Sequence, residues 1–157
     1  MGCREDLEAY LNENGVAFEV HEQRPAYTAQ EVAAAGHVPG RMLAKVVMAV
    51  ADGGLAMLVL PASLKVDFKR ASSALGAREL RLAHEDEFEA VFPGCELGAM
   101  PPFGNRYGTP VYVDSVLAED ERIVFQAGTH SETMTVRYAD YSRLVKPAVV
   151  QISRAGA

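Results

Sequence analysis

The chain has 157 residues, of which 49% are hydrophobic, and its formal net charge is −6. This length fits a single globular domain over residues 1–157, and the acidic balance argues against a protein that wraps long nucleic acid, because neutralising phosphates needs an excess of Lys and Arg. No run approaches the roughly 20 apolar residues of a membrane-spanning helix, and the acidic N-terminus is unlike a secretory signal, so we expect a cytoplasmic protein.

Short helices and strands are mixed along the chain. In the first half of the chain, we expect a helix over residues 4–14, a strand over 16–22, a helix over 28–36, and two strands over 42–51 and 55–61 joined by a hairpin turn at 52–54. A helix over 67–75, a strand over 79–83 and a helix over 85–92 follow. The last part is expected to contain strands over 110–114, 122–128 and 133–138, a helix over 139–145 and a strand over 148–152. This order predicts an α+β or mixed α/β domain and not a doubly wound sheet.

Lys45 lies in the most apolar stretch of the chain, the predicted strand over residues 42–51. Burying an ammonium costs free energy unless an anionic or polar group meets it. Two explanations stay open from this residue alone. It is either an edge-strand lysine that reaches water or discourages edge pairing, or a lysine that serves a binding site.

Two glycine-containing segments are candidates for such a site. The loop over residues 94–110 is too long for a simple connector, and its glycines permit backbone angles that are closed to other residues. Gly128, Thr129 and His130 follow a predicted strand and would place a hydroxyl and an imidazole beside an approachable backbone. The alternatives are a packed surface loop and a structural histidine.

Other kinds of site have little support. The chain has no P-loop, no dinucleotide-binding glycine motif, no nucleophile elbow and no metal-ligand spacing, so we expect no metal and no cofactor. Cys3 and Cys95 are too few for a disulfide scaffold or a zinc site, and we expect two reduced thiols, with a role for Cys95 near a ligand left open. A pocket with one lysine, one histidine and glycine backbone would bind an anion or a carbonyl better than it would supply a nucleophile.

The order of the segments resembles the YbaK/prolyl-tRNA synthetase-associated editing-domain family, the free-standing aminoacyl-tRNA deacylases. The resemblance covers nearly the whole chain and runs through Tyr27-Thr28, AKVVMAV, LVLPASLKVD, GCELGAMPPFG, AGTH and RYADYSRLVKP. It implies a mixed, partly barrel-like β-sheet surrounded by short helices.

The resemblance also implies a function. The expected activity is trans-editing: hydrolysis of the ester of a mischarged aminoacyl-tRNA, commonly tRNA(Pro) carrying Ala, Cys or another small residue. The partner is then the acceptor end of aminoacyl-tRNA, and the acidic surface suggests that a synthetase or another factor helps to deliver it. A non-catalytic module that binds an aminoacyl or nucleotide ligand is the main alternative, and a general hydrolase of small activated esters is a third.

Site residues follow from the same resemblance. Catalytic roles are implied for Lys45, Gly98 and His130, with Lys45 holding the tRNA 3′ end and the glycine loop stabilising the oxyanion. Substrate contacts are implied for Tyr27, Thr28, Ser63, Pro102, Phe103, Gly104, Gly128 and Thr129. Val46 follows the lysine where some alanine-specific members carry a polar residue, which argues against alanine specificity.

Overall fold

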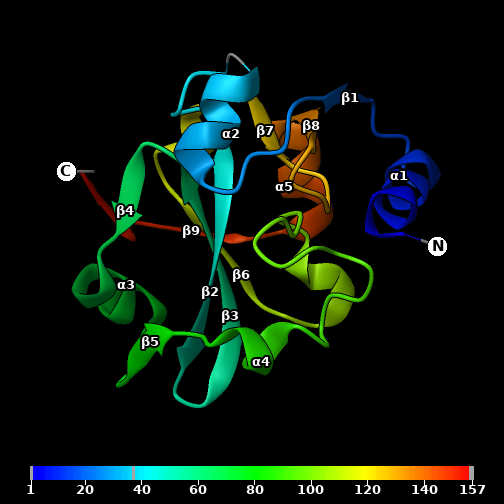
Figure 1. The fold of residues 1–157 in the computed structure, drawn as a ribbon. Helices are drawn as coiled ribbons and strands as arrows, with labels where there is room; N and C mark the ends of the chain where they lie inside the picture. The colour runs from blue at the N-terminus through cyan, green and yellow to red at the C-terminus, as the bar shows by residue number, and fades with distance from the viewer. Residues whose placement is uncertain (1, 37, 156–157) are drawn as a thin grey trace.

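The computed structural model describes residues 2–36 and 38–155, which form short helices packed around mixed β-strands (Figure 1). The helices are α1 (Cys3–Glu13), α2 (Ala29–Gly36), α3 (Phe68–Leu75), α4 (Glu85–Phe88) and α5 (Tyr138–Val145), with 3-10 turns η1 (Gly104–Tyr107) and η2 (Leu117–Glu119). The strands are β1 (Phe18–Glu22), β2 (Ala44–Ala51), β3 (Gly54–Pro61), β4 (Leu64–Val66), β5 (Leu80–Leu82), β6 (Val111–Asp114), β7 (Arg122–Gln126), β8 (Glu132–Arg137), β9 (Ala148–Val150) and β10 (Ser153–Ala155).

Within the described residues, these strands form three sheets. The largest has the order β5-β2-β3-β6-β9 and is mixed, because β3 is antiparallel to β2 but parallel to β6. The order β1-β8-β7 is antiparallel throughout, and β10 pairs with β4. A parallel bridge between Leu43 and Val124 brings β7 beside the start of β2, so the two larger sheets curve around a common interior as the resemblance implied.

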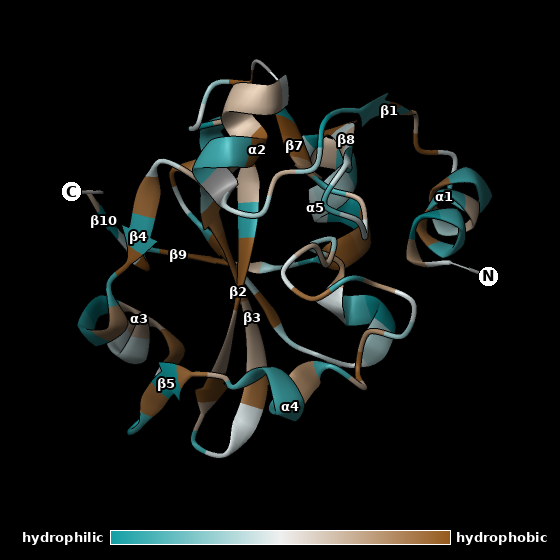
Figure 2. Cartoon of the chain, viewed as in Figure 1, coloured by the Kyte–Doolittle hydropathy of each residue, from teal (hydrophilic) through white to brown (hydrophobic). Residues whose placement is uncertain are grey.

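Both faces of β2 are buried, which explains why its sequence is a nearly continuous apolar run. Ala44, Met48 and Val50 face the main core, which also contains side chains of α1, α5 and the loop over residues 94–110. On the opposite face, Leu43 belongs to a small cluster under α2, and Ala49 belongs to another under α3. Figure 2 shows the hydrophobic strands at the centre and hydrophilic residues on the outer helices.

Most of the predicted elements are confirmed, and the differences concern one short helix and two short strands. Asp67 caps α3 by accepting from the Arg70 amide at 3.0 Å, and Gly76 ends that helix at a φ of 65°. The helix expected over residues 85–92 ends as α4 at Phe88. Strands β4 and β10 have only three residues each and were not predicted. Their pairing joins distant parts of the chain, which a local pattern does not reveal.

No helix among the described residues combines the length and the apolar character needed to cross a bilayer.

Candidate functional site

Lys45 projects from the face of β2 that α2 and α3 cover. Its neighbours on that face are Leu43, in the cluster under α2, and Val47, which packs against the cluster under α3. Lys45 pairs with Leu60 of β3, and β2 lies between β3 and β5 in its sheet. However, β5 pairs with β2 only over residues 49–51, and the bridge to β7 is at Leu43, so among the described residues Lys45 has a strand partner on the β3 side alone. The explanation of Lys45 as an edge-strand lysine therefore stays a prediction.

The ammonium of Lys45 is half-buried and has a single neutral partner. It donates a hydrogen bond to the main-chain oxygen of Leu64, the first residue of β4. Burial, and secondarily the positive charge of Lys65, lowers the pKa of Lys45 below its usual value. No carboxylate within residues 2–36 and 38–155 forms an ion pair with it. This cation therefore has capacity for an anionic ligand.

A second group of predicted residues meets around the imidazole of His130. The ring packs against Tyr27, with centroids 4.6 Å apart, and a Cβ on Gly98 would lie 3.6 Å from its Cε1 atom. The main-chain oxygen of His130 accepts from the Ala26 amide at 2.8 Å. The segment before α2, the turn after β7 and the glycine loop thus converge at this histidine.

Hydrogen bonds define the state of the His130 ring. Its Nε2 atom lies 2.9 Å from the Leu97 oxygen, which can only accept, so Nε2 carries the proton. Its Nδ1 atom is buried and has no partner among the described residues. In the neutral ring, Nδ1 is a free acceptor. The Glu96 carboxylate lies close by and accepts from the His130 amide at 3.2 Å.

Gly98 has the left-handed backbone conformation that favours glycine, with a φ of 83°. It is exposed, and in the part of the chain that the structure describes its N–H donates to no main-chain oxygen. This donor belongs to a residue that lies near the His130 ring, and its role toward an oxyanion stays a prediction.

A small apolar cluster lies under α2. It contains Ala26, Val32, Leu43, Ala62 and Val124. The polar residues within two positions of its members along the chain include Tyr27, Lys45, Ser63 and Gln126. The cluster therefore joins the segments from which these four residues come.

Gln126 is a candidate site residue that the sequence interpretation did not single out. The bridge between Leu43 and Val124 places these residues side by side, so Lys45 and Gln126, each two positions further, project to the same face. The side-chain amide nitrogen of Gln126 is buried and lacks an acceptor among the described residues. The sequence signal for this residue is a polar side chain directly after the apolar run Ile123, Val124 and Phe125.

Thr28 and Thr129 use their hydroxyls within the protein. Thr28 accepts from the Glu31 amide at 3.1 Å, and the Glu31 carboxylate accepts from the Tyr27 amide at 3.3 Å, so the two side chains fix the start of α2. Thr129 donates to the Glu132 carboxylate at 3.0 Å. Both residues hold segments that carry site residues, and their contact with a substrate stays a prediction.

Pro102, Phe103 and Gly104 lie apart from these groups. Phe103 is only 2% exposed and packs in the main core, edge-to-face with Phe125 and Tyr141. Tyr141 donates to the Pro102 oxygen at 2.7 Å, and a Cβ on Gly104 would lie 3.1 Å from Val111. This end of the loop is fixed by packing, and the predicted substrate contacts of these three residues have no geometric support.

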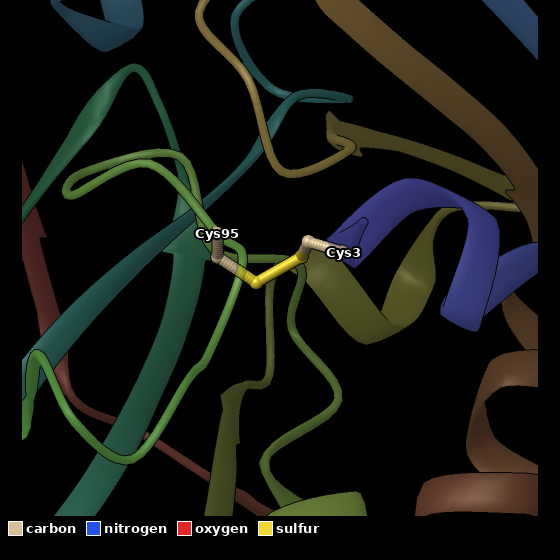
Figure 3. Close-up of a disulfide and its surroundings, with 2 residues drawn as sticks. All are labelled: Cys3 and Cys95. Carbon is tan, nitrogen blue, oxygen red and sulfur yellow. A yellow bond between two sulfur atoms is a disulfide. The ribbon is translucent and has the colours of Figure 1, made fainter. Parts of the chain in front are cut away.

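Cys3 and Cys95 form a disulfide, which corrects the expectation of two reduced thiols. Their Cα atoms lie 5.0 Å apart, within the range that a disulfide spans. Figure 3 shows the bridge joining the start of α1 to the glycine loop. The two cysteines are 92 positions apart in the sequence, so no local pattern reveals the pair, and Cys95 anchors the loop three residues before Gly98.

Two features favour glycine at position 128, next to this bridge. Its φ is 100°, and an added Cβ would lie 2.7 Å from the sulfur of Cys3. Its N–H donates to Ala99 at 2.9 Å, and its oxygen accepts from Glu96 at 2.8 Å. Gly128 therefore ties the turn after β7 to both the glycine loop and α1.

Replacing Gly128 by alanine is expected to lower the free energy of unfolding by about 1–3 kcal/mol more than Gly108→Ala does, because overpacking adds to the backbone strain. Gly108 is the matched control, since its φ is 73° and a Cβ there would meet nothing within 4 Å. Urea unfolding of both variants measures the difference. Equal losses of unfolding free energy in the two variants would mean that the Cys3 side chain moves aside without an energetic penalty.

Comparison with known proteins gives a consistent result. A family model described as aminoacyl-tRNA editing domain matches residues 23–144. The "Multifunctional Ser/Thr-tRNA deacylase ProXp-y" of Escherichia coli K12 is 29% identical over 99 residues, which cover 62% of this chain. The match spans only 59% of the length of that relative.

Solved structures show the same fold. A crystal structure described as that of a candidate trans-editing enzyme for prolyl-tRNA synthetase superposes with a TM-score of 0.83 at 22% identity, covering 99% of both chains. A hypothetical protein superposes with a TM-score of 0.83 at 19% identity, covering 94% of this chain and 99% of its own. At these identities the likeness concerns the fold.

Proposed function

Because the chain belongs to the aminoacyl-tRNA editing domain family, we propose that it is a trans-editing hydrolase that cleaves the ester of a mischarged aminoacyl-tRNA. The observation that carries the proposal is the Lys45 ammonium, which is half-buried and forms no ion pair with a carboxylate of the residues that the structure describes. The substrate class is tRNA(Pro) carrying Ala, Cys or another small residue. The tRNA substrate also supports action in the cytoplasm, with a synthetase or other delivery factor as partner.

The charges of the site match the two ends of such a substrate. Lys45 offers a cation for the phosphate of the terminal nucleotide. On the other side, the Nδ1 atom of His130 and the carboxylate of Glu96 are acceptors for the α-ammonium of the amino acid. Gln126, on the Lys45 face, supplies an amide donor for the ribose or the ester.

The chemical step needs no protein nucleophile. A water molecule adds to the ester carbonyl carbon, the bond from that carbon to the ribose oxygen breaks, and the ribose oxygen takes the proton that the water loses. The Gly98 N–H is the donor for the oxyanion of the intermediate. Losing one such donor typically costs about 2.7–4 kcal/mol of barrier.

The test is a deacylation panel with tRNA(Pro) charged with Ala, Cys, Ser, Thr or Pro. Ser and Thr belong in it because the named relative is a Ser/Thr-tRNA deacylase. We expect hydrolysis of at least one small mischarged ester well above the buffer rate, with Pro spared. If no ester is cleaved while an aminoacyl-adenosine analogue still binds, the chain is a non-catalytic binding module. Equal cleavage of simple activated esters would identify a general hydrolase.

Replacing His130 by alanine is expected to change the ratio of kcat/KM between two small amino acids by about 2- to 12-fold, the worth of one hydrogen bond. His21→Ala is the matched control, because His21 is exposed on β1. The charged-tRNA panel and a thermal unfolding curve are measured for both. An unchanged preference together with a large stability loss would show that His130 is structural.

A further inference from the structure

We propose that four exposed cations next to Lys45 form a docking surface for the phosphate backbone of the tRNA acceptor stem. They are Lys65 on β4, Lys69 and Arg70 on α3, and Arg154 on β10, and we call them the cationic ribbon. The inference rests on the proposed function, since it extends the contact of the terminal nucleotide to the nucleotides that precede it.

The central pair of the ribbon carries an electrostatic cost. Arg154 lies directly opposite Lys65 across the antiparallel pair of β4 and β10, so both side chains are on the same face. Like charges in this position destabilise a sheet. No carboxylate within the described residues forms an ion pair with either. An anionic partner would relieve the repulsion.

The cations of α3 extend the same surface. The Arg70 guanidinium donates to the Ser153 oxygen at 3.1 Å, which holds it beside Arg154. Lys69 and Arg70 occupy the first turn of α3, where the helix dipole disfavours cations. The nearby Asp67 carboxylate is engaged by the Arg70 amide. Figure 1 shows β4 and α3 on the same side of the molecule, close to the C-terminal segment.

The ribbon is continuous with the candidate site. Lys45 donates to the oxygen of Leu64, the residue before Lys65, and the charge of Lys65 helps to lower the pKa of Lys45. Phosphates spaced along a nucleic-acid strand can therefore reach Lys45 first and the ribbon next. On a chain with a net charge of −6, this local excess of cations would also orient the approaching tRNA.

A second pair of facing arginines provides a contrast. Arg122 and Arg137 lie opposite each other across β7 and β8, but Glu19 lines the same cavity, and Asp120 and Glu121 line the next one beside Arg122. These carboxylates form no ion pair with Arg122 or Arg137 among the described residues, but the three of them equal in number the three cations there, Arg41, Arg122 and Arg137. The Arg122 and Arg137 pair thus has the same cross-strand geometry without a local excess of positive charge, which makes it the matched control.

The experiment compares the double variants Lys65→Gln/Arg154→Gln and Arg122→Gln/Arg137→Gln with the wild type for binding of uncharged tRNA(Pro), by fluorescence anisotropy from 50 to 200 mM salt. Losing two phosphate contacts makes the slope of log affinity against log salt concentration shallower by about 1.8. The ratio of wild-type affinity to ribbon-variant affinity should therefore fall about 12-fold between 50 and 200 mM salt. The control variant should keep the wild-type slope. The thermal midpoint of the ribbon variant should be equal or higher, since a repulsion is removed.

The outcomes separate this inference from the proposed function. An identical salt slope for the ribbon variant and the wild type, or absence of tRNA binding by the wild type, overturns the docking surface. A lowered thermal midpoint with unchanged affinity overturns it too and assigns the cations a structural role. If ribbon-dependent tRNA binding is found but the charged panel is not hydrolysed, the docking surface stands and the hydrolase proposal fails.

Discussion

Lys45→Ala is expected to lower kcat/KM for the preferred mischarged tRNA by about 10- to 150-fold, the worth of one hydrogen bond to a charged group at 1.5–3 kcal/mol. The reason is that Lys45 is a half-buried cation whose recorded hydrogen bond is to a neutral main-chain oxygen, so its charge has capacity to act on the substrate. Single-turnover deacylation with a saturating and a limiting enzyme concentration separates binding from the chemical step.

Two further variants at this position isolate the charge. Lys45→Met keeps most of the side-chain volume and should lose as much activity as Lys45→Ala, whereas Lys45→Arg should retain part of it. Because the pKa of Lys45 is lowered in the fold, the folded state binds fewer protons than the unfolded state as pH rises toward the usual lysine value. At pH values below the lowered pKa, the charged lysine therefore reduces the free energy of unfolding. This penalty disappears as the pH rises from the lowered pKa to the usual pKa of lysine.

Stability measurements complete this test. Lys45→Met removes the unfavourable charge but also the bond to Leu64, worth about 0.5–1.5 kcal/mol, so its free energy of unfolding at neutral pH should stay within about 1 kcal/mol of the wild type. Wild-type turnover by the methionine variant would remove Lys45 from the mechanism. A large loss of stability would instead make the lysine a structural residue.

The parts of the fold with local causes could be predicted from the sequence. Asp67 and Gly76 bound α3 because a carboxylate satisfies a free amide at one end and glycine adopts a positive φ at the other. Thr28 and Glu31 begin α2 through the same kind of contact. The lysine in an apolar strand was recognisable because its burial needs a reason.

The parts of the fold that depend on contacts between distant segments could not be predicted from the sequence. The surroundings of Lys45 depend on the pairing of β2 with β3 and on the approach of β4, and its hydrogen-bond partner is a main-chain oxygen, which every residue has. Phe103 was assigned to the pocket because it lies in the glycine loop, but the aromatic side chains that enclose it come from other segments. The resemblance supplied the order of motifs and not the direction of each side chain.

Reducing the Cys3–Cys95 disulfide is expected to lower the free energy of unfolding by about 2–4 kcal/mol, because the bridge links residues 92 positions apart and restricts the unfolded chain. Cys3 is 4% exposed and lies against Gly128, so the reduced thiols would remain packed in the folded state. Urea unfolding with and without dithiothreitol measures the difference. Thiol titration of the unfolded chain should detect two thiols only after reduction.

Cysteine variants test whether the two residues act as one unit. Cys3→Ser, Cys95→Ser and the double variant should lose similar amounts of stability, because either change breaks the same bond, and dithiothreitol should have no effect on any of them. Deacylation should fall as well, since Cys95 fixes the loop three residues before Gly98. Additive losses, or two reactive thiols in protein prepared without reductant, would contradict the bridge. Disulfides are rare in reducing compartments, so the second result would favour the cytoplasmic expectation.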